Sequence, residues 1–102
     1  MSAKKSKSKK IEYDGYLYYY RYGFLHNDKG PAVVDTIQNI FEYRLFGKIH
    51  RIDGPAVFGK DSLKNTIDEE WWLNGKRYEF EEWCKNTPLD KHNLAMLVLQ
   101  YA

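Results

Sequence analysis

The chain has 102 residues, of which 43% are hydrophobic and 17% aromatic. This length suits one small domain and leaves no room for a second hydrophobic core. A single cysteine, Cys84, excludes an internal disulfide, and no stretch approaches the roughly 18 apolar residues of a membrane span. We therefore expect an intracellular protein without a secretion signal or a membrane anchor.

Positive charge is concentrated at the start of the chain. Residues 1–10 contain five lysines and no acidic residue, whereas the remainder is net negative although the whole chain is formally +2. Because this segment has almost no apolar surface to bury, we predict a disordered basic tail over 1–10. It either attaches electrostatically to nucleic acid or serves as a solubilising terminus. Its lysines are Lys4, Lys5, Lys7, Lys9 and Lys10.

A ten-residue block occurs twice and organises the rest of the chain. Residues 23–32 and 47–56 each begin with glycine, place a histidine three residues later, and end in Gly-Pro-Ala. Internal repeats of this kind indicate a repeated supersecondary unit. Each block joins an aromatic run to a short apolar run, which favours a strand, a turn and a returning strand.

The predicted strands follow in chain order. Tyr13-Asp14-Gly15 predicts a turn, 16–22 a strand, 33–36 its return, and 41–46 the strand of the second copy. A third, incomplete copy begins with a strand over 69–73. The Asn74-Gly75 pair that follows is typical of a two-residue hairpin, because both positions tolerate positive φ.

The C-terminal region has a helical pattern instead. Residues 79–86 mix acids with two aromatics three positions apart, Thr87-Pro88 interrupts the pattern, and 89–102 carries an apolar stripe at helical spacing. An open sheet needs a cover for one face and protection for its last edge. The fold class is therefore α+β: an antiparallel β-meander of about five to six strands over 11–78, with helices over 79–102 packed on it as a cap.

The block residues have a structural interpretation. We expect the block glycines to reach positive φ, the prolines to start strands, and each histidine to bond the backbone of the neighbouring Asp-Gly turn. A metal or catalytic role for the histidines is the alternative, but zinc needs three or four ligands. We predict no catalytic residue, metal or cofactor. The predicted turn residues are Gly23, His26, Gly30, Pro31, Gly47, His50, Asp53, Gly54, Pro55 and Gly75.

The repeat resembles a family found in bacteriophage and giant-virus proteins, similar in style to MORN-type β-hairpin repeats, with units of the form Trp-Tyr-x-Asn-Gly-Lys-x-His-Arg-x-Asp-Gly-Pro-Ala. The second copy carries most of this pattern from Gly47 to Ala56, and the third carries Trp71 and Asn74-Gly75-Lys76. Tyr22 and Phe46 depart from it, because the family has asparagine there. The resemblance implies a phage origin, a β-meander and no established catalytic function.

Aromatic residues on one strand face are the candidate binding surface. By alternation, that face also holds an arginine, and exposed aromatic patches with arginine mark protein-binding sites. The predicted protein-binding residues are Tyr18, Tyr20, Tyr22, Arg44, Phe46 and Trp72. The alternative is that the helices cover these rings or that the rings only pack along the sheet.

Our leading hypothesis is a small non-catalytic phage protein that acts in the host cytoplasm by binding a host protein and inhibiting a defence or housekeeping complex. One alternative is a nucleic-acid-binding accessory protein that uses the lysine tail and the aromatic residues. A virion assembly component is another.

Overall fold

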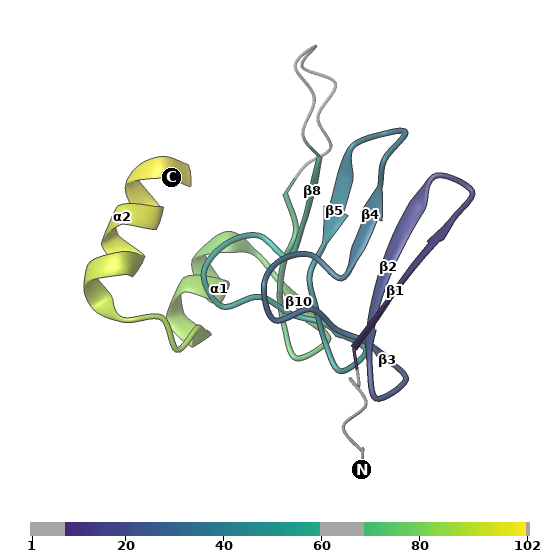
Figure 1. Cartoon of the computed structure of the whole chain (residues 1–102). Helices are drawn as coiled ribbons and strands as arrows, with labels where there is room; N and C mark the ends of the chain where they lie inside the picture. Colours follow the sequence, from purple (N-terminus) through teal and green to yellow (C-terminus); the bar gives the residue numbers. More distant parts are fainter. Residues whose placement is uncertain (1–7, 60–68, 102) are drawn as a thin grey trace.

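The computed structural model describes residues 8–59 and 69–101, and these ranges form ten strands and two helices in an α+β fold (Figure 1). The elements are β1 (Ser8–Tyr13), β2 (Tyr16–Arg21), β3 (Phe24–Leu25), β4 (Val33–Asp35), β5 (Ile40–Glu42), β6 (Arg44–Leu45), β7 (Lys48–Ile49), β8 (Val57–Gly59), β9 (Trp71–Leu73), β10 (Lys76–Tyr78), α1 (Phe80–Asn86) and α2 (Lys91–Tyr101).

The strands form the predicted antiparallel meander. The largest sheet has the order β1-β2-β4-β5-β8, with β3 paired to the end of β2. A bridge between Val57 and Glu70 continues this order into the β9–β10 hairpin, and β6 and β7 form a separate hairpin. Strand follows strand in sequence order, so neighbouring repeats lie next to one another.

The predicted disordered tail is wrong for residues 8–10. Ser8, Lys9 and Lys10 form the first half of β1, which pairs with β2 along its whole length. All six residues of β1 are exposed, so the strand depends on backbone pairing and not on burial, and lysines are common on such edge strands. Residues 1–7 of the predicted tail, with Lys4, Lys5 and Lys7, lie outside the described residues.

Four hairpins turn through a two-residue pair that ends in glycine. The pairs are Asp14-Gly15, Tyr22-Gly23, Phe46-Gly47 and Asn74-Gly75, with φ of 43–54° at the non-glycine and 81–89° at the glycine. Two positive φ values in succession are typical of the type I′ turn, which matches the twist of the flanking strands. The turn predictions at 13–15 and 74–75 are confirmed.

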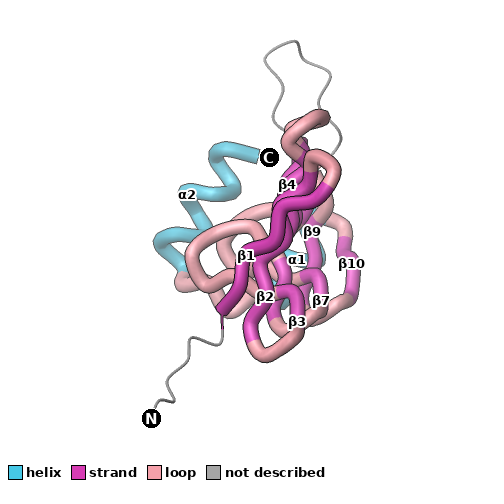
Figure 2. Tube along the Cα trace, turned by 45° about the vertical axis from the view of Figure 1, so that its right-hand side comes forward, coloured by secondary structure: helices cyan, strands magenta, loops and turns pink. Residues whose placement is uncertain are grey.

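The hairpin tips of the three repeats stack on one another. The backbone N–H of Gly47 donates to the carbonyl of Leu25 over 2.8 Å, and Gly75 makes the same bond to Ile49 over 2.8 Å. As a result β3, β7 and β10 lie side by side at one end of the molecule (Figure 2). This end brings the turn residues of the repeats together.

The helices pack on the third repeat. The buried core consists of Trp71, Leu73 and Trp83, with the Trp71 and Trp83 ring centroids 4.8 Å apart. Leu94, Leu97 and Tyr101 of α2 pack against this core.

Helix α1 also contacts the second repeat. Trp83 Nε1 donates to the carbonyl of Arg51 over 3.3 Å, and the Thr87 hydroxyl donates to the carbonyl of Ile52 over 2.6 Å. The cap therefore covers the face of Trp71 at one end of the meander, while α2 extends to one side (Figure 1). Among the described helices, none is long and apolar enough to cross a membrane.

Candidate functional site

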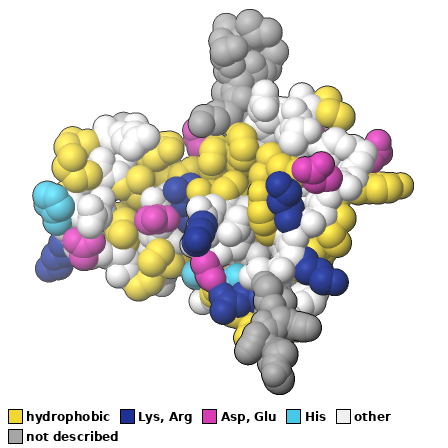
Figure 3. Space-filling model, viewed as in Figure 1, with side chains coloured by type: hydrophobic (Ala, Val, Ile, Leu, Met, Phe, Trp, Pro, Cys, Tyr) yellow, Lys and Arg dark blue, Asp and Glu magenta, His cyan; other side chains and the backbone are white. Residues whose placement is uncertain are grey.

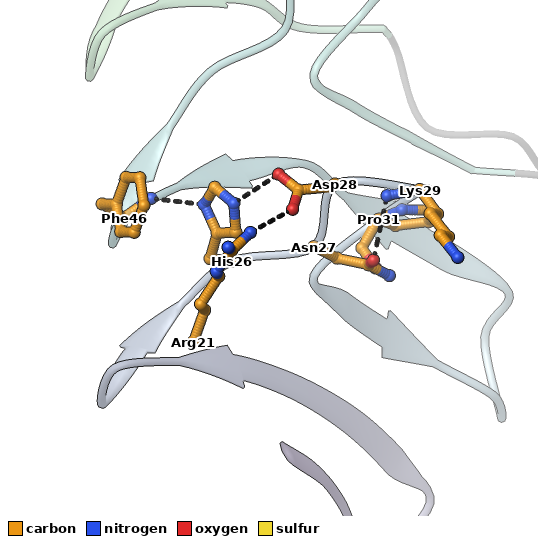
Figure 4. Close-up of polar contacts among 7 residues, drawn as sticks. All are labelled: Arg21, His26, Asn27, Asp28, Lys29, Pro31 and Phe46. Atoms are coloured by element: carbon orange, nitrogen blue, oxygen red, sulfur yellow. Dashed lines mark hydrogen bonds and ion pairs between the residues drawn. The ribbon is translucent and has the colours of Figure 1, made fainter. Parts of the chain in front are cut away.

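His26 lies at the centre of a hydrogen-bond network that joins the first two repeats (Figure 4). Its Nδ1 accepts from the backbone N–H of Phe46 over 3.0 Å, and its Nε2 lies 2.7 Å from Oδ1 of Asp28. Because a backbone N–H can only donate, Nδ1 is the acceptor and the proton of the neutral ring is on Nε2. His26 therefore donates to Asp28, whose carboxylate also pairs with Arg21.

This network leaves neither ring nitrogen of His26 available to exchange a proton with a substrate. Only 5% of the residue is exposed, and both ring nitrogens already have partners. The hydrogen bond from His26, together with the Arg21 guanidinium, lowers the pKa of the Asp28 carboxyl below its ordinary value of 3.8. A general base needs a nitrogen lone pair that can reach a substrate, so the geometry supports a structural role for His26.

His50 repeats the arrangement in the second copy. Its Nδ1 accepts from the backbone N–H of Asn74 over 2.8 Å, and burial lowers its pKa below the ordinary 6.5. The predicted partner was wrong: each histidine accepts from the backbone of the two-residue turn of the following repeat and not from the backbone of the adjacent Asp-Gly segment, of which His26 contacts only the Asp28 side chain. Asp53, from that segment, accepts from Nε of Arg51 over 2.9 Å.

The block glycines Gly30 and Gly54 do not have the positive φ that we predicted. A Cβ at Gly54 would lie 2.8 Å from Cζ of Arg51, so a larger residue there would displace the Arg51 guanidinium. That guanidinium donates to the carbonyl of Pro55 over 3.1 Å. In the first copy Asn27 donates to the equivalent carbonyl of Pro31 over 3.0 Å. The Gly-Pro segments thus close the loop by accepting a side-chain hydrogen bond.

Three aromatic side chains are exposed at the stacked tips, and we call them the tip patch: Tyr22, Phe24 and Phe46. Their exposed fractions are 57%, 53% and 46%. The rings of Phe24 and Phe46 meet edge to face at 6.3 Å, and Phe46 also stacks on His26 at 4.1 Å. Phe24 was missed by sequence reasoning, although it follows directly after the Tyr22-Gly23 turn.

Two members of the tip patch have unfavourable backbone conformations. Tyr22 and Phe46 have φ of 50° and 43°, a region that is uncommon for bulky residues. The same turn position holds Asp14 and Asn74 in the other two hairpins, and these residue types tolerate it well. Such conformations cost about 1–2 kcal/mol per residue relative to a relaxed backbone and cluster at functional sites.

The other predicted binding residues lie elsewhere and are half-buried. Tyr18 belongs to a stacked row with Tyr16 and Tyr20 along β2, with centroids 5.8 and 6.4 Å apart. Arg44 is held by Glu42 over 2.7 Å, and Trp72 Nε1 donates to Glu70 over 2.9 Å. Three strands of the meander separate β2 from β9, so the six predicted residues do not form one surface.

The space-filling view shows how the hydrophobic side chains are distributed. They gather over the strands on this side of the molecule and are interrupted by individual basic and acidic side chains (Figure 3). Such mixing is typical of ordinary protein surface. The tip patch is distinguished by its position on the stacked turns.

The described residues offer little for covalent or metal chemistry. Burial and the nearby Glu81 carboxylate raise the pKa of the Cys84 thiol, which disfavours the reactive thiolate. Within 8–59 and 69–101, no three His, Cys, Asp or Glu side chains gather to hold a metal ion. Comparisons with protein-family models, with curated proteins and with solved structures find no match to this chain.

Proposed function

We propose that this chain is a non-catalytic binding protein whose tip patch docks onto a partner protein. The observation that carries the proposal is the placement of Tyr22 and Phe46 at positive φ with about half of each residue exposed. A turn selected only for folding would hold asparagine, aspartate or glycine there, as the other two hairpins do. Aromatic residues retained at a cost in stability indicate selection for contact with another molecule.

The chemistry of the tip patch suits protein recognition. Tyrosine, phenylalanine and tryptophan each bury about 150–250 Å² on contact, and aromatic residues are enriched at protein interfaces. The turn that carries Phe46 is docked onto the first repeat: the Gly47 N–H donates to the Leu25 carbonyl and the Phe46 N–H donates to Nδ1 of His26. Phe46 is therefore presented by a preorganised scaffold, which limits the entropy lost on binding.

The identity of the partner follows from the repeat resemblance alone. We propose on that basis a phage protein that binds a host protein or complex in the host cytoplasm and inhibits a defence or housekeeping function. The resemblance supports the viral part of this proposal, and the tip patch supports the part that concerns the binding surface.

The test is capture from host lysate with variants matched for the kind of residue removed. The test variant, Tyr22→Asn with Phe24→Ser, removes two aromatic residues of the tip patch. The control variant, Tyr13→Ser, removes a tyrosine that is 72% exposed beside the Asp14-Gly15 turn, at the tip of the β1–β2 hairpin. We expect the wild type and Tyr13→Ser to capture the same protein, and the tip variant to lose it by at least about tenfold. Equal capture by the tip variant would overturn the proposal.

A further inference from the structure

A hollow of about 370 Å³ lies between the open end of the β1–β2 hairpin and the turn at 26–29. Four basic residues and one acidic residue, Asp28, line it. The basic residues are Lys9, Lys10, Arg21 and Lys29. Because successive residues of a strand point to opposite faces, Lys10 shares the face of Arg21 and Lys9 lies on the other. Figure 4 shows Arg21 and Asp28 beside the buried His26, and Lys29 next to Pro31.

The single carboxylate does not neutralise the hollow. Asp28 is already engaged by Arg21 and His26. Lys10 lies 3.8 Å from Glu12, but both side chains are more than half exposed, so that pair is weak. Within the described residues Lys29 forms no ion pair. The hollow therefore has an excess of positive charge available to a ligand.

Charge is segregated along the β1–β2 hairpin. A second hollow, at the turn end of the same hairpin, is lined by Glu12 and Asp14 and contains no basic residue. The open end is thus basic and the turn end acidic, although the chain beyond residue 10 is net negative. Like charges gathered around a concavity raise the local concentration of a ligand of opposite sign.

We propose that the basic hollow binds a phosphate group, carried by a nucleotide or by single-stranded nucleic acid. Lysine ammonium groups bind phosphate as point charges, and arginine offers several donors. The volume lies within the range of small-ligand sites, about 300–1,000 Å³. Tyr19 also lines the hollow and lies on the same strand face as Arg21, and a tyrosine ring beside basic groups favours a base next to the phosphate.

This site is separate from the tip patch. Arg21 pairs with Phe24 across β2 and β3, so the two sites adjoin, but they have no residue in common. The phosphate proposal therefore does not depend on the protein-binding proposal. Each is tested with a different set of variants.

The experiment compares two triple variants of the full chain with the same change in charge. The first variant replaces the three lysines that line the hollow: Lys9→Gln, Lys10→Gln and Lys29→Gln. The control, Lys48→Gln, Lys76→Gln, Lys85→Gln, removes three exposed lysines elsewhere. Binding to inorganic phosphate, adenosine monophosphate, a ten-nucleotide single-stranded DNA and a polyglutamate peptide is followed by amide NMR shifts and fluorescence anisotropy.

We expect the wild type and the control variant to bind the DNA or the nucleotide, and the hollow variant to bind at least about tenfold more weakly. For DNA, three phosphate contacts predict a slope of log affinity against log salt near about −2. Binding of the mononucleotide as tightly as the DNA assigns the site to a nucleotide, and a clear preference for DNA assigns it to the nucleic-acid backbone.

Three outcomes overturn the proposal. The first is that none of the phosphate probes binds. The second is that both triple variants weaken binding equally, because the attraction then comes from overall charge. The third is that polyglutamate binds as tightly as DNA, because the hollow then accepts an acidic protein segment in place of phosphate.

Discussion

The backbone N–H of Phe46 donates to Nδ1 of His26 over 3.0 Å, which ties the turn of the second repeat to the loop of the first. The next pair, Asn74 and His50, makes the same bond over 2.8 Å. Beside each bond the turn glycine donates to the residue before the histidine. Each repeat therefore offers two acceptors, and each following turn fills them with two donors.

Removing His26 should destabilise the fold. His26→Ala leaves the Phe46 N–H without its acceptor, leaves a gap beneath the Phe46 ring and releases Asp28. We expect the free energy of unfolding to fall by about 2–3 kcal/mol, measured by urea denaturation. His26→Asn is the matched control, because its amide oxygen can accept the Phe46 bond, and it should lose less. Equal losses would show that the hydrogen bond to Nδ1 contributes nothing.

Protonation of His50 should make the protein less stable in mild acid. Burial lowers its pKa in the folded chain below 6.5, so near that pH the unfolded chain binds more protons. The free energy of unfolding is then fully retained above about 6.5 and declines as the pH falls below it. Urea denaturation at several pH values from 7.5 to 5.5 measures this decline. His50→Asn keeps an acceptor for Asn74 without titrating and should flatten the curve, whereas an unchanged decline would contradict the assignment.

The turn residues should show opposite effects when they are exchanged. Tyr22→Asn relieves a backbone cost of about 1–2 kcal/mol but loses the contact with the Arg21 guanidinium, which lies 5.6 Å from the ring centroid. That contact is worth about 0.5–1 kcal/mol. We therefore expect a net gain in unfolding free energy near 0.5 kcal/mol, since the two effects partly cancel.

The reverse exchange completes this test. Asn74→Tyr places a bulky residue at φ 48° and should cost about 1–2 kcal/mol. Both variants are compared with the wild type by urea denaturation. A loss of stability in Tyr22→Asn would argue that Tyr22 is kept for folding and would weaken the case for the tip patch.

The cap should depend on Trp83. This residue is fully buried between Trp71 and Phe80 and donates to the Arg51 carbonyl. Trp83→Ala should cost about 3–5 kcal/mol, a large part of the total stability of a domain this size. Trp83→Phe keeps a ring and should cost less than half as much. Urea denaturation followed by far-UV circular dichroism checks both, and a small effect of Trp83→Ala would show that the helices are not needed to close the sheet.

Much of the architecture could be predicted because it depends on local chemistry. Asn74-Gly75 specifies its turn by conformational preference, and Thr87-Pro88 separates the two helices because proline restricts the residue before it. The repeat then places equivalent residues at equivalent positions. Period and turn chemistry together were sufficient for the fold class and for β2, β4 and β9, whereas the strand predicted over 41–46 is divided into β5 and β6, which lie in different sheets.

The errors come from interactions between segments distant in sequence. Lysine-rich composition does not reveal that β2 offers an edge to which Ser8, Lys9 and Lys10 can pair. The close approach to Gly54 comes from the Arg51 guanidinium packed over it. The tip patch could not be predicted as a unit, because Phe24 and Phe46 meet only when one repeat stacks on the next.

The paired acceptors at Leu25–His26 and Ile49–His50 have an architectural consequence. A repeat that accepts hydrogen bonds from the following turn, and whose own turn donates the same bonds, can be followed by another repeat of the same kind. Whole repeats can then be added without a change at either end of the array. The array of repeats ends at α1 and α2, which take the place of the third loop and pack on Trp71. The number of tips that this array displays therefore follows from where the helices replace a loop.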